Sequence, residues 1–533
     1  MAKACISFKE TRYFSELICD YLDQADTLKT FYNRFPNFDN FNKQIENKQS
    51  TFSSKSRIVL VNELQEQYSA IHASKSTLSN IEALSKNNTF TITTGHQLNL
   101  FTGPLYFLYK IVSTINLSKE LKQKFPRYNF VPIYWMATED HDFDEINYFN
   151  FQSRKVQWSR ASHGAVGELN TDGLNEVYKA FSKTLGLGKN ADKLRDLFQS
   201  AYVKHDNLTD ATRFLANALF SDYGLVILDA NVPELKRLFM PFMEDELENQ
   251  TSFRLVNESS KKLESIKSSY KAQVNPREIN LFYLDQGLRE RIVYEGERYK
   301  VLNTTLSWSH SEIKKVLSEH PEKFSPNVIM RPLYQEVVLP NLCYIGGGGE
   351  LAYWLQLKTY FDAMNVVFPM LLLRNSVLIK TEKQSGKQEK LGLNNADLFL
   401  KQDALIQKKT QALSAIDIDF SKQKMHLKQQ FQALYNIAGQ TDKSFLGAVA
   451  AQERKQIKGL EHLEKRLLKA QKRKLGVQLE KVSVLQNELF PNQNLQERNI
   501  NFSELYLEFG DQLIPALIAY LKPLQGDFSV LTI

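Results

Sequence analysis

Cysteine is scarce in this chain, and the three present, Cys5, Cys19 and Cys343, form no C-x-x-C pair. The sequence therefore supports neither a disulfide framework nor a structural zinc knuckle. The chain also lacks any apolar run of about 18 residues or more, so we expect no membrane span. Its first residues lack the apolar core of a signal peptide, and with so little cysteine they indicate a cytoplasmic protein.

A large excess of charge is also missing. The 67 Lys and Arg against 60 Asp and Glu leave a formal net charge of +7 over 533 residues. This is a weak argument for nucleic-acid binding, and an anionic small-molecule pocket explains it as well. The Lys-rich stretch 454–474 is the alternative surface for nucleic acid, but its charges alternate with Glu and Gln, as on a solvated coiled-coil face. We expect no nucleic-acid partner.

The first 380 or so residues change character once, near residue 86. Residues 1–85 are polar and space their apolar residues by three and four, which predicts helices. Residues 86–382 then show a β-prone run, a glycine loop, a helical pattern from Pro104 to Lys124 and an apolar run at 129–137. Strand, loop, helix and strand in this order predict an α/β fold with a doubly wound parallel sheet.

The same pattern recurs further along this core. The other apolar runs that we interpret as buried strands are 223–230, 341–345 and 366–373. Insertions interrupt the core at about 150–220 and 255–325. The second of them contains a predicted antiparallel hairpin at 281–301, with Asp285-Gln286-Gly287 at its turn.

Proline is absent from residues 383–490, which are rich in Lys, Gln, Glu and Leu. Apolar residues at three- and four-residue steps predict a long antiparallel helical pair or coiled coil there. Gly439 and Gly447 flank the expected break between the two helices, and Pro491 ends the second one. We expect the tail 491–533 to return to the core.

The first group of candidate functional residues follows the first predicted strand. A glycine loop at this place lets backbone N–H groups approach a ligand, and the N-terminus of the next helix favours an anion. His96 is a catalytic candidate because it can donate a proton to a developing negative charge; a tight turn with a capping histidine is the alternative. The binding candidates of this loop and helix are Gly95, Gln97, Thr102, Gly103, Tyr106 and Lys110.

A second group follows the predicted strand at 129–137. Six of the eight residues in TEDHDFDE, 138–145, are ionisable. Ligands of an open α/β sheet lie beyond the carboxyl ends of its strands, so this segment should border the pocket. Adjacent carboxylates raise one another's pKa, and a histidine between them can act as acid, base or metal ligand. The alternatives are a divalent-metal site and a solvated acidic turn. The catalytic candidates are Asp140, His141 and Asp142, and Glu139 is a binding candidate.

A third group surrounds the predicted strand at 341–345. Four consecutive glycines follow it, and they suit a place where backbone approaches a ligand. Arg331 can clamp a carboxylate or phosphate, or form a structural salt bridge instead. Cys343 is expected to be a small core residue rather than a nucleophile. The binding candidates here are Arg331, Gln335, Gly346, Gly347, Gly348, Glu350 and Tyr353. We expect all three groups to meet in one cleft.

Six segments of the chain together resemble the bacillithiol cysteine-adding enzyme family. They are TTGHQLNLFTGPLYFLYK, PIYWMATEDHDFDEIN, YGLVILDA, VNPREINLFYLD, FSPNVIMRPLYQEVVLPNLCYIGGGGELAYW and LQERNINF. The resemblance runs from about Tyr13 into the C-terminal tail. It implies a Rossmann-like core of the nucleotidyltransferase and class I synthetase type, with connective insertions and a C-terminal coiled coil that supports a homodimer.

The resemblance also implies a reaction, the joining of the cysteine carboxyl to the amine of glucosaminyl-malate to form bacillithiol. Amide formation from a free carboxylate needs activation, so we expect ATP as co-substrate, through an acyl-adenylate or an acyl-phosphate. The sequence contains no Walker loop. Arg498, in the tail, is a candidate for a second anion site or for a structural bridge. Two rival functions are a nucleotidyl or glycosyl transferase on the same core and a non-catalytic coiled-coil scaffold.

Overall fold

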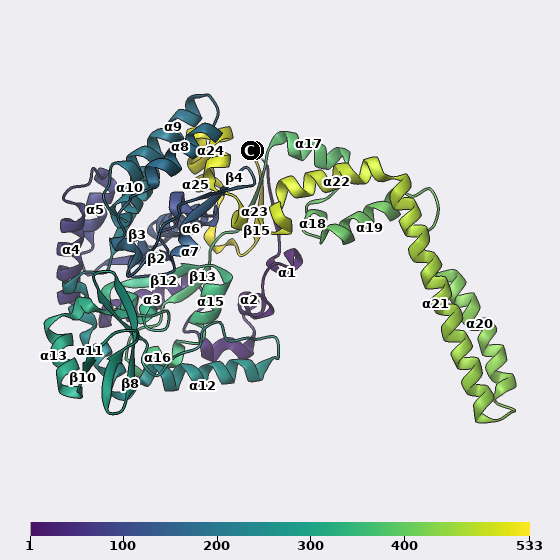
Figure 1. The fold of residues 1–533 in the computed structure, drawn as a ribbon, viewed down its shortest axis with the longest axis horizontal. Helices are drawn as coiled ribbons and strands as arrows, with labels where there is room; N and C mark the ends of the chain where they lie inside the picture. The colour runs from purple at the N-terminus through teal and green to yellow at the C-terminus, as the bar shows by residue number, and fades with distance from the viewer. Residues whose placement is uncertain (1) are drawn as a thin grey trace. The chain divides into compact units, whose positions relative to one another are not determined.

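The computed structural model describes residues 2–533, which form two compact units (Figure 1). The first unit comprises residues 3–378 and 496–531. The second comprises residues 379–495 together with Ala2 and residues 532–533. The tail after residue 495 therefore belongs to the same unit as the predicted core, and this unit contains every candidate functional residue.

A five-stranded sheet of order β13-β12-β2-β3-β6 lies at the centre of the first unit. Its strands are β2 (Thr89–His96), β3 (Asn129–Met136), β6 (Val226–Asp229), β12 (Asn341–Gly346) and β13 (Met370–Leu373). All neighbouring strands run parallel, which confirms the predicted α/β class. Chain order reverses between β2 and β12, and open sheets of this kind bind ligands at such a reversal.

Apolar side chains on both faces of the sheet explain its burial. Helix α6 (Tyr106–Lys124) follows β2 and packs on β2 and β3, as the pattern after Pro104 predicts. Helix α3 (Phe38–Thr51) packs against β12. One core cluster joins these elements through Ile45, Ile92, Leu117 and Leu342, all fully buried. The predicted core cysteine, Cys343, lies in the same cluster.

The N-terminal segment is helical as predicted except at its start. Strand β1 (Ala2–Ile6) pairs with β15 (Phe528–Thr532), which pairs in turn with β14 (Val377–Lys380). The helices that follow are α1 (Phe8–Thr11), α2 (Glu16–Leu22), α4 (Ser54–Tyr68) and α5 (Lys75–Ala83). Helical spacing dominates residues 1–85, but five residues are too few to show a strand until its partner is known.

Two insertions separate the strands of the core. The first holds the hairpin β4 (Tyr148–Phe151) and β5 (Arg154–Gln157), then α8 (Leu174–Thr184), α9 (Lys189–Phe198) and α10 (Leu208–Phe220). The second follows α11 (Pro233–Asn249) and contains α12 (Thr251–Ile266) and an antiparallel sheet of order β10-β9-β8-β7-β11. Strands β7 (Leu281–Asp285), β8 (Leu288–Glu295) and β9 (Arg298–Val301) confirm the predicted hairpin and its turn. Strands β10 (Ser307–Trp308) and β11 (Phe324–Pro326) flank α13 (His310–Glu319).

The remaining helices of the first unit lie between the strands of the core or in the C-terminal tail. They are α7 (Phe143–Ile146), α14 (Arg331–Val338), α15 (Gly348–Trp354), α16 (Lys358–Ala363), α23 (Gln496–Asn499), α24 (Phe502–Phe509) and α25 (Leu513–Tyr520). Helix α24 packs beside α9, and α25 packs on α6 (Figure 1). The tail thus covers helices of the core and of the first insertion.

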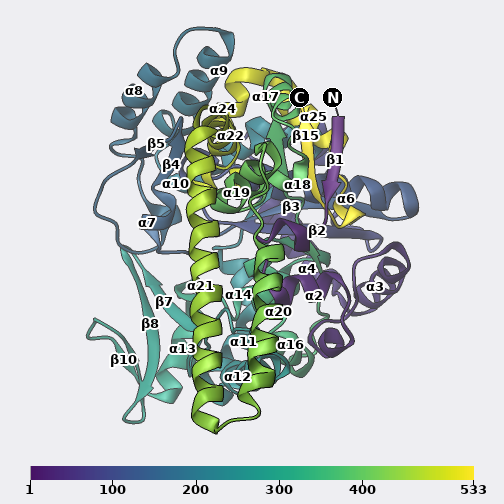
Figure 2. The ribbon, with the colours of Figure 1, turned by 90° about the vertical axis from the view of Figure 1, so that its right-hand side faces the viewer.

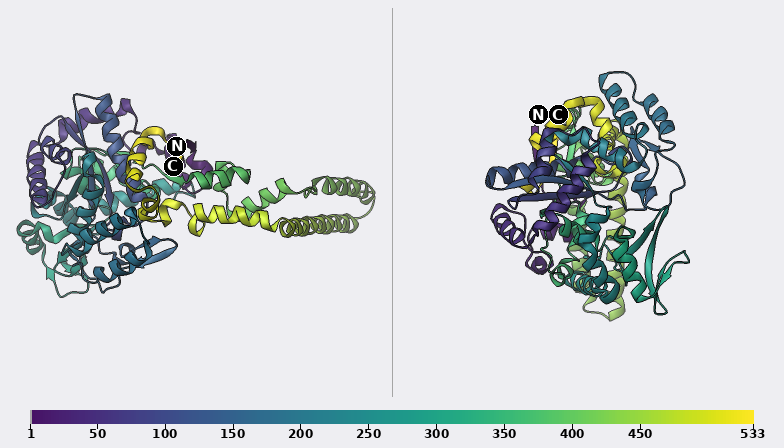
Figure 3. Two further views of the ribbon diagram at one scale, coloured as in Figure 1. Left: turned by 90° about the horizontal axis from the view of Figure 1, so that it is seen from above. Right: turned by 90° about the vertical axis from the view of Figure 1, so that its left-hand side faces the viewer.

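The second unit is helical, as the sequence predicts. Helices α20 (Ser421–Ala438) and α21 (Lys443–Lys474) lie side by side as an antiparallel pair (Figures 2 and 3), and α19 (Gln402–Leu413) packs on α21 and α22 (Gly476–Leu489). The other helices are α17 (Glu382–Lys390) and α18 (Asn395–Leu398). The turn ends where the Asp442 side chain caps α21, so Gly447 lies within that helix instead of beside the break.

Candidate active site

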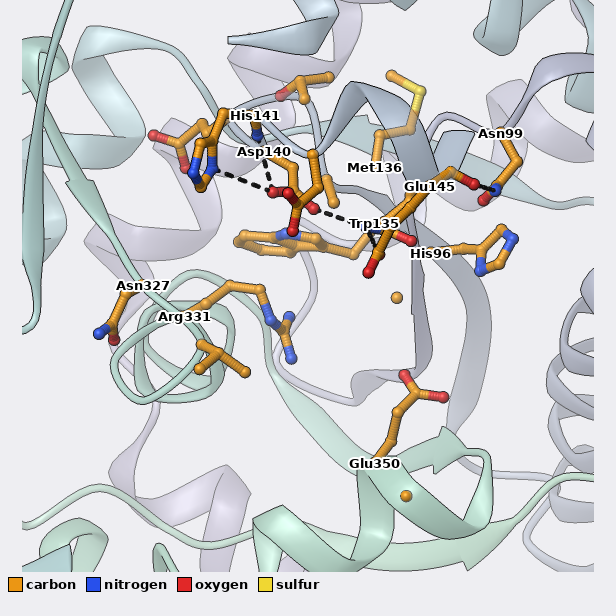
Figure 4. A pocket seen from close by; sticks show the side chains of 18 of the residues that line it. His96, Asn99, Trp135, Met136, Asp140, His141, Glu145, Asn327, Arg331 and Glu350 are labelled. Atoms are coloured by element: carbon orange, nitrogen blue, oxygen red, sulfur yellow. Dashed lines mark hydrogen bonds and ion pairs between the residues drawn. The ribbon is translucent and has the colours of Figure 1, made fainter. Parts of the chain in front are cut away.

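The loops after β2, β3 and β12 open into one cavity of about 1130 Å3 (Figure 4). Gly95 and His96 end β2 and lie in register with Trp135 and Met136 of β3. The acidic segment starts directly after β3, and the glycines follow β12. The predicted meeting of the three groups in one cleft is confirmed.

Most of the predicted site residues line this cavity. They are Gly95, His96, Gln97, Tyr106, Lys110, Glu139, Asp140, His141, Asp142, Arg331, Gly347, Gly348, Glu350, Tyr353 and Arg498. Four predicted residues lie behind its wall: Thr102, Gly103, Gln335 and Gly346. Figure 4 shows Asp140 and His141 on one side of the cavity and Arg331 and Glu350 on the other.

Asp140 is the most strongly held carboxylate of the acidic segment. Its Oδ2 accepts a hydrogen bond from Gln97 Nε2 at 2.9 Å, and its Oδ1 accepts one from the His141 backbone N–H at 2.8 Å. Burial raises the pKa of Asp140, but hydrogen bonds from His141 and Gln97 and the charge of Arg289 outweigh it and hold that pKa far below its usual range. Asp140 therefore remains a carboxylate at neutral pH.

His141 contacts an arginine from the inserted sheet. Arg289 Nη1 lies 2.6 Å from His141 Nδ1, and the guanidinium also lies over the Phe282 ring at 3.9 Å. A guanidinium has only donors, so His141 Nδ1 must be the acceptor in this contact. The same Nδ1 atom also lies 3.7 Å from Asp140 Oδ1.

The other acidic residues of the segment differ in exposure. Glu139 forms an ion pair with Lys236 of α11, whose Nζ also donates to the Phe324 carbonyl oxygen at 2.7 Å. This pair ties the loop after β3 to α11 and β11. Asp142 is exposed to solvent at the cavity. For this residue the alternative of a solvated acidic turn also agrees with the structure.

His96 is buried in the wall of the cavity. Its ring packs edge to face on Tyr106, with centroids 5.6 Å apart, and its Nε2 atom has no hydrogen-bond partner among the residues that the structure describes. Burial, followed by the charges of Lys110 and Arg374, lowers the pKa of His96 well below its usual value. The imidazole is neutral at physiological pH and does not serve as a cap.

Lys110 and Glu350 form an ion pair at the switch between β2 and β12. Lys110 Nζ lies 2.7 Å from Glu350 Oε2 and donates to the Gly95 carbonyl oxygen at 2.7 Å. Glu350 also accepts hydrogen bonds from the Gly347 N–H at 2.8 Å and the Tyr344 hydroxyl at 2.7 Å. Burial raises the pKa of Glu350, but these partners outweigh it and lower that pKa. The pair holds the two glycine loops together.

Three arginines, from α14, the loop after β13 and the tail, line the same cavity. Arg331 Nη1 donates to Gln335 Oε1 at 3.0 Å, while its Nη2 has no hydrogen-bond partner within residues 2–533. Arg374 is buried over the Tyr106 ring at 5.1 Å, and its Nε is also without a partner. Arg498 is exposed at the cavity. Guanidinium groups that line a cavity are suited to binding an anionic ligand.

The four residues behind the wall have structural contacts. Gly103 has a φ of +63°, and a Cβ there would meet the Asn99 Cβ at 2.7 Å, so this part of the loop is a tight turn. Thr102 precedes it with a φ of +70°. The Gly346 carbonyl oxygen accepts from the Arg374 N–H at 2.9 Å, and a Cβ on Gly346 would meet Leu351 at 2.9 Å. Gln335 contacts Arg331 from behind.

Several arginines of the cavity were missed by the sequence analysis. They are Arg277, Arg289, Arg291 and Arg374. Arg374 directly follows β13, so the same strand-end rule that selected the other loops could have found it. Arg289 and Arg291 alternate on β8 and so share a face, but only folding brings that face to the cavity.

The part of the chain that the structure describes, residues 2–533, contains no group of three or more His, Cys, Asp or Glu side chains placed to hold a metal ion. Within the same residues no helix is both long enough and apolar enough to cross a membrane.

Comparison with known families gives two matches that together span nearly the whole chain. The model described as "Bacillithiol biosynthesis BshC, N-terminal Rossmann-like domain" matches residues 1–375. The model described as "Bacillithiol biosynthesis BshC, C-terminal coiled-coil domain" matches residues 377–533. These descriptions agree with the parallel sheet of the first unit and the helical pair of the second.

Curated relatives are similar over their full length. A protein of Flavobacterium johnsoniae, named "Putative cysteine ligase BshC", is 60% identical over 533 residues and 100% of both chains. Proteins of the same name from Cytophaga hutchinsonii and Salinibacter ruber are 38% and 30% identical. These matches cover 97% and 96% of this chain, and 96% and 94% of the relatives.

Proposed function

Because the chain belongs to the BshC family of bacillithiol biosynthesis, we propose that it is a cysteine ligase. Its substrates in this proposal are L-cysteine, glucosaminyl-malate and ATP, and its product is bacillithiol. The observation that carries the proposal is the cavity at the sheet reversal, which is lined by the ionised Asp140 and by Arg331, Arg374 and Arg498. A carboxylate can bind the cysteine ammonium, and the guanidinium groups can bind malate or phosphate.

The cysteine carboxylate requires activation before an amine can attack it. In the proposed first step a carboxylate oxygen attacks the α-phosphorus of ATP, and pyrophosphate leaves. In the second step the glucosamine nitrogen attacks the acyl carbon, AMP leaves with that oxygen, and the nitrogen loses a proton. The Rossmann-like core favours this adenylate route over an acyl-phosphate, which would release ADP and phosphate instead.

The chain's own residues suit distinct roles in this scheme. The low pKa of Asp140 makes it a weak base, so it anchors the cysteine ammonium and does not take a proton during the reaction. Asp142 is exposed at the same loop and takes the proton from the glucosamine nitrogen. His141 and His96 both line the cavity and donate to oxygen atoms that gain negative charge.

Arg331 and Arg374 supply the positive charge for anionic groups. Both present an unpaired guanidinium nitrogen, and burial strengthens the attraction that a guanidinium exerts on an anion. We assign the malate carboxylates to Arg331 and the nucleotide phosphates to the loop at Gly95 and Gln97, with Arg498 as a second anion contact. The backbone at Gly347 and Gly348 lets the substrate approach closely.

The test is a reaction with purified protein, ATP, glucosaminyl-malate and cysteine labelled with 18O in its carboxyl group. The adenylate route predicts the new amide together with AMP that carries one 18O atom. Label in inorganic phosphate, together with ADP, would instead show the acyl-phosphate route. If folded wild-type protein with all three substrates forms no amide, the ligase proposal itself is contradicted. Transfer of a sugar from a nucleotide sugar would instead support the transferase.

We further propose a cytoplasmic homodimer that forms through α20 and α21. Large apolar side chains on this pair are exposed, among them Ile437 at 57% and Phe445 at 46%. The three cysteines form no disulfide, as a reducing compartment would require. Light scattering of the wild type should give twice the monomer mass, and Ile437→Glu should shift it toward the monomer. A monomeric wild type would contradict the proposal.

A further inference from the structure

A chain of buried polar contacts connects the cavity to helix α3 on the far side of α14. Gln335 Oε1 accepts from Arg331 Nη1 at 3.0 Å, and Gln335 Nε2 donates to Glu336 Oε1 at 2.9 Å. Glu336 Oε2 pairs with Lys48 Nζ at 3.2 Å. Of these four residues only Arg331 lines the cavity.

Gln335 can serve Arg331 only in one orientation of its amide. A guanidinium has donors alone, so the amide oxygen must face Arg331 and the amide nitrogen must face away. Glu336 favours this orientation because its Oε1 atom accepts from both Gln335 Nε2 and Asn341 Nδ2. A donor at the position of Glu336 Oε1 would turn the amide around and present its N–H2 group to the guanidinium.

Glu336 is itself held in place from two sides. Asn341 Nδ2 donates to Glu336 Oε1 at 2.6 Å, and Lys48 supplies the opposite charge. The side chains of Lys48 and Glu336 are 2% and 0% exposed, so neither charge is neutralised by water. An unpaired charge at this depth is strongly unfavourable, which keeps the two ions together.

We propose that Glu336, balanced by Lys48, is a positioning residue that fixes the Gln335 amide and thereby holds Arg331 in the orientation that binds the anionic substrate. Glu336 never touches the ligand; it acts through Gln335 alone. The kinetic part of this inference rests on the proposed function, whereas the orientation of Arg331 does not. A substitution in α3, remote in sequence from every cavity residue, thus changes substrate affinity.

The deciding variants are Glu336→Gln alone and Glu336→Gln combined with Lys48→Met. A glutamine at 336 has one acceptor, so it cannot satisfy Gln335 and Asn341 on one side and Lys48 on the other. When Lys48 is replaced as well, the amide oxygen of the new glutamine side chain at position 336 can face Gln335 and Asn341. Its N–H2 group then meets the apolar methionine at position 48. The single variant should raise the KM for glucosaminyl-malate about tenfold with little change in kcat, and the double variant should recover most of this loss.

Two controls separate positioning from general destabilisation. Asp397→Asn removes another buried carboxylate, which pairs with Lys408 at 2.5 Å in the second unit, and should lower stability without raising that KM. Gln335→Met breaks the connection at its middle and should raise the KM as Glu336→Gln does. If Glu336→Gln does not fold, the KM of the Gln335→Met variant tests the proposal in its place.

A crystal structure of each variant tests the orientation without any assay. In Glu336→Gln the Arg331 Nη1 to Gln335 Oε1 hydrogen bond should be lost, and in the double variant it should return. If Arg331 keeps that bond in the single variant, or if the folded double variant binds glucosaminyl-malate as weakly as the single one, the proposal is wrong. If the wild type shows no ligase activity, the proposed function fails and the crystal structures alone decide this inference.

Discussion

Arg374 and Glu497 form a buried ion pair between the end of β13 and the C-terminal tail, with Nη2 and Oε1 2.8 Å apart. Glu497 also accepts hydrogen bonds from the Ser376 hydroxyl at 3.2 Å and the Val377 N–H at 3.1 Å. The tail therefore holds an arginine of the cavity from behind. Residues 123 positions apart in the sequence form one part of the site.

Glu497→Ala should destabilise the protein by about 3–5 kcal/mol, because it leaves the Arg374 charge buried and unpaired. Denaturant unfolding measures the loss. Combining Glu497→Leu with Arg374→Met should cost much less stability, since both charges leave together, yet ligase activity should stay low because the cavity has lost Arg374. Equal stability of the Glu497→Ala variant and the wild type would argue against a buried pair.

Asp140→Asn should abolish bacillithiol production in a cell-based complementation assay. With purified protein, losing a charge-assisted contact to the cysteine ammonium should raise the KM for cysteine about tenfold to a hundredfold. Asp144→Asn is the matched control, because Asp144 lies in the same acidic segment, is exposed and does not line the cavity. Normal bacillithiol levels with folded Asp140→Asn protein would remove Asp140 from the mechanism.

Arg289→Met should move the acidic limb of the kcat/KM profile to higher pH. Burial raises the pKa of Asp140, and Arg289 is one of the groups that lower it, so removing this charge lets the pKa rise. Asp140 would then be protonated at a higher pH than in the wild type. Arg291→Met, two residues along the same strand, is the control and should leave that limb in place; a shift in both variants would contradict a specific contact with Asp140.

His96 should make the protein less stable in mild acid. Its pKa in the folded state lies well below the usual value of about 6.5, so the unfolded chain binds a proton that the folded chain excludes. Stability is therefore unaffected above about pH 7 and falls as the pH drops below about 6.5. Between about pH 7 and about pH 5, the free energy of unfolding should decline less in His96→Gln than in the wild type. Urea titrations at each pH would measure this.

The four glycines at the end of β12 and just after it should differ in their tolerance of alanine. A Cβ on Gly346 would meet Leu351 and Tyr344 at 2.9 Å, so Gly346→Ala should cost about 1–3 kcal/mol through overpacking. Gly349 has no atom within 4 Å of such a Cβ, and Gly349→Ala should leave stability unchanged. Thermal unfolding of the two variants makes the comparison, and equal melting temperatures would contradict it.

The amino-acid sequence alone determined which loops form the site. Buried strands with polar residues at their ends are visible in the local pattern, and parallel strands of one sheet end at one edge. Gly95, Asp140 and Gly347 therefore had to lie near one another once the sheet was inferred. Helical spacing likewise predicted the second unit, although the position of its turn depended on the Asp442 cap rather than on glycine.

Only the tertiary structure decided the partners of these residues. Arg289 reaches His141, Lys236 reaches Glu139 and Glu497 reaches Arg374 from elements far away in the sequence. No local pattern encodes such pairs, because burial decides whether a charge must find an opposite one, and burial exists only after the chain has packed. For the same reason Gln335, which the sequence predicts to contact the ligand, instead supports Arg331 from behind.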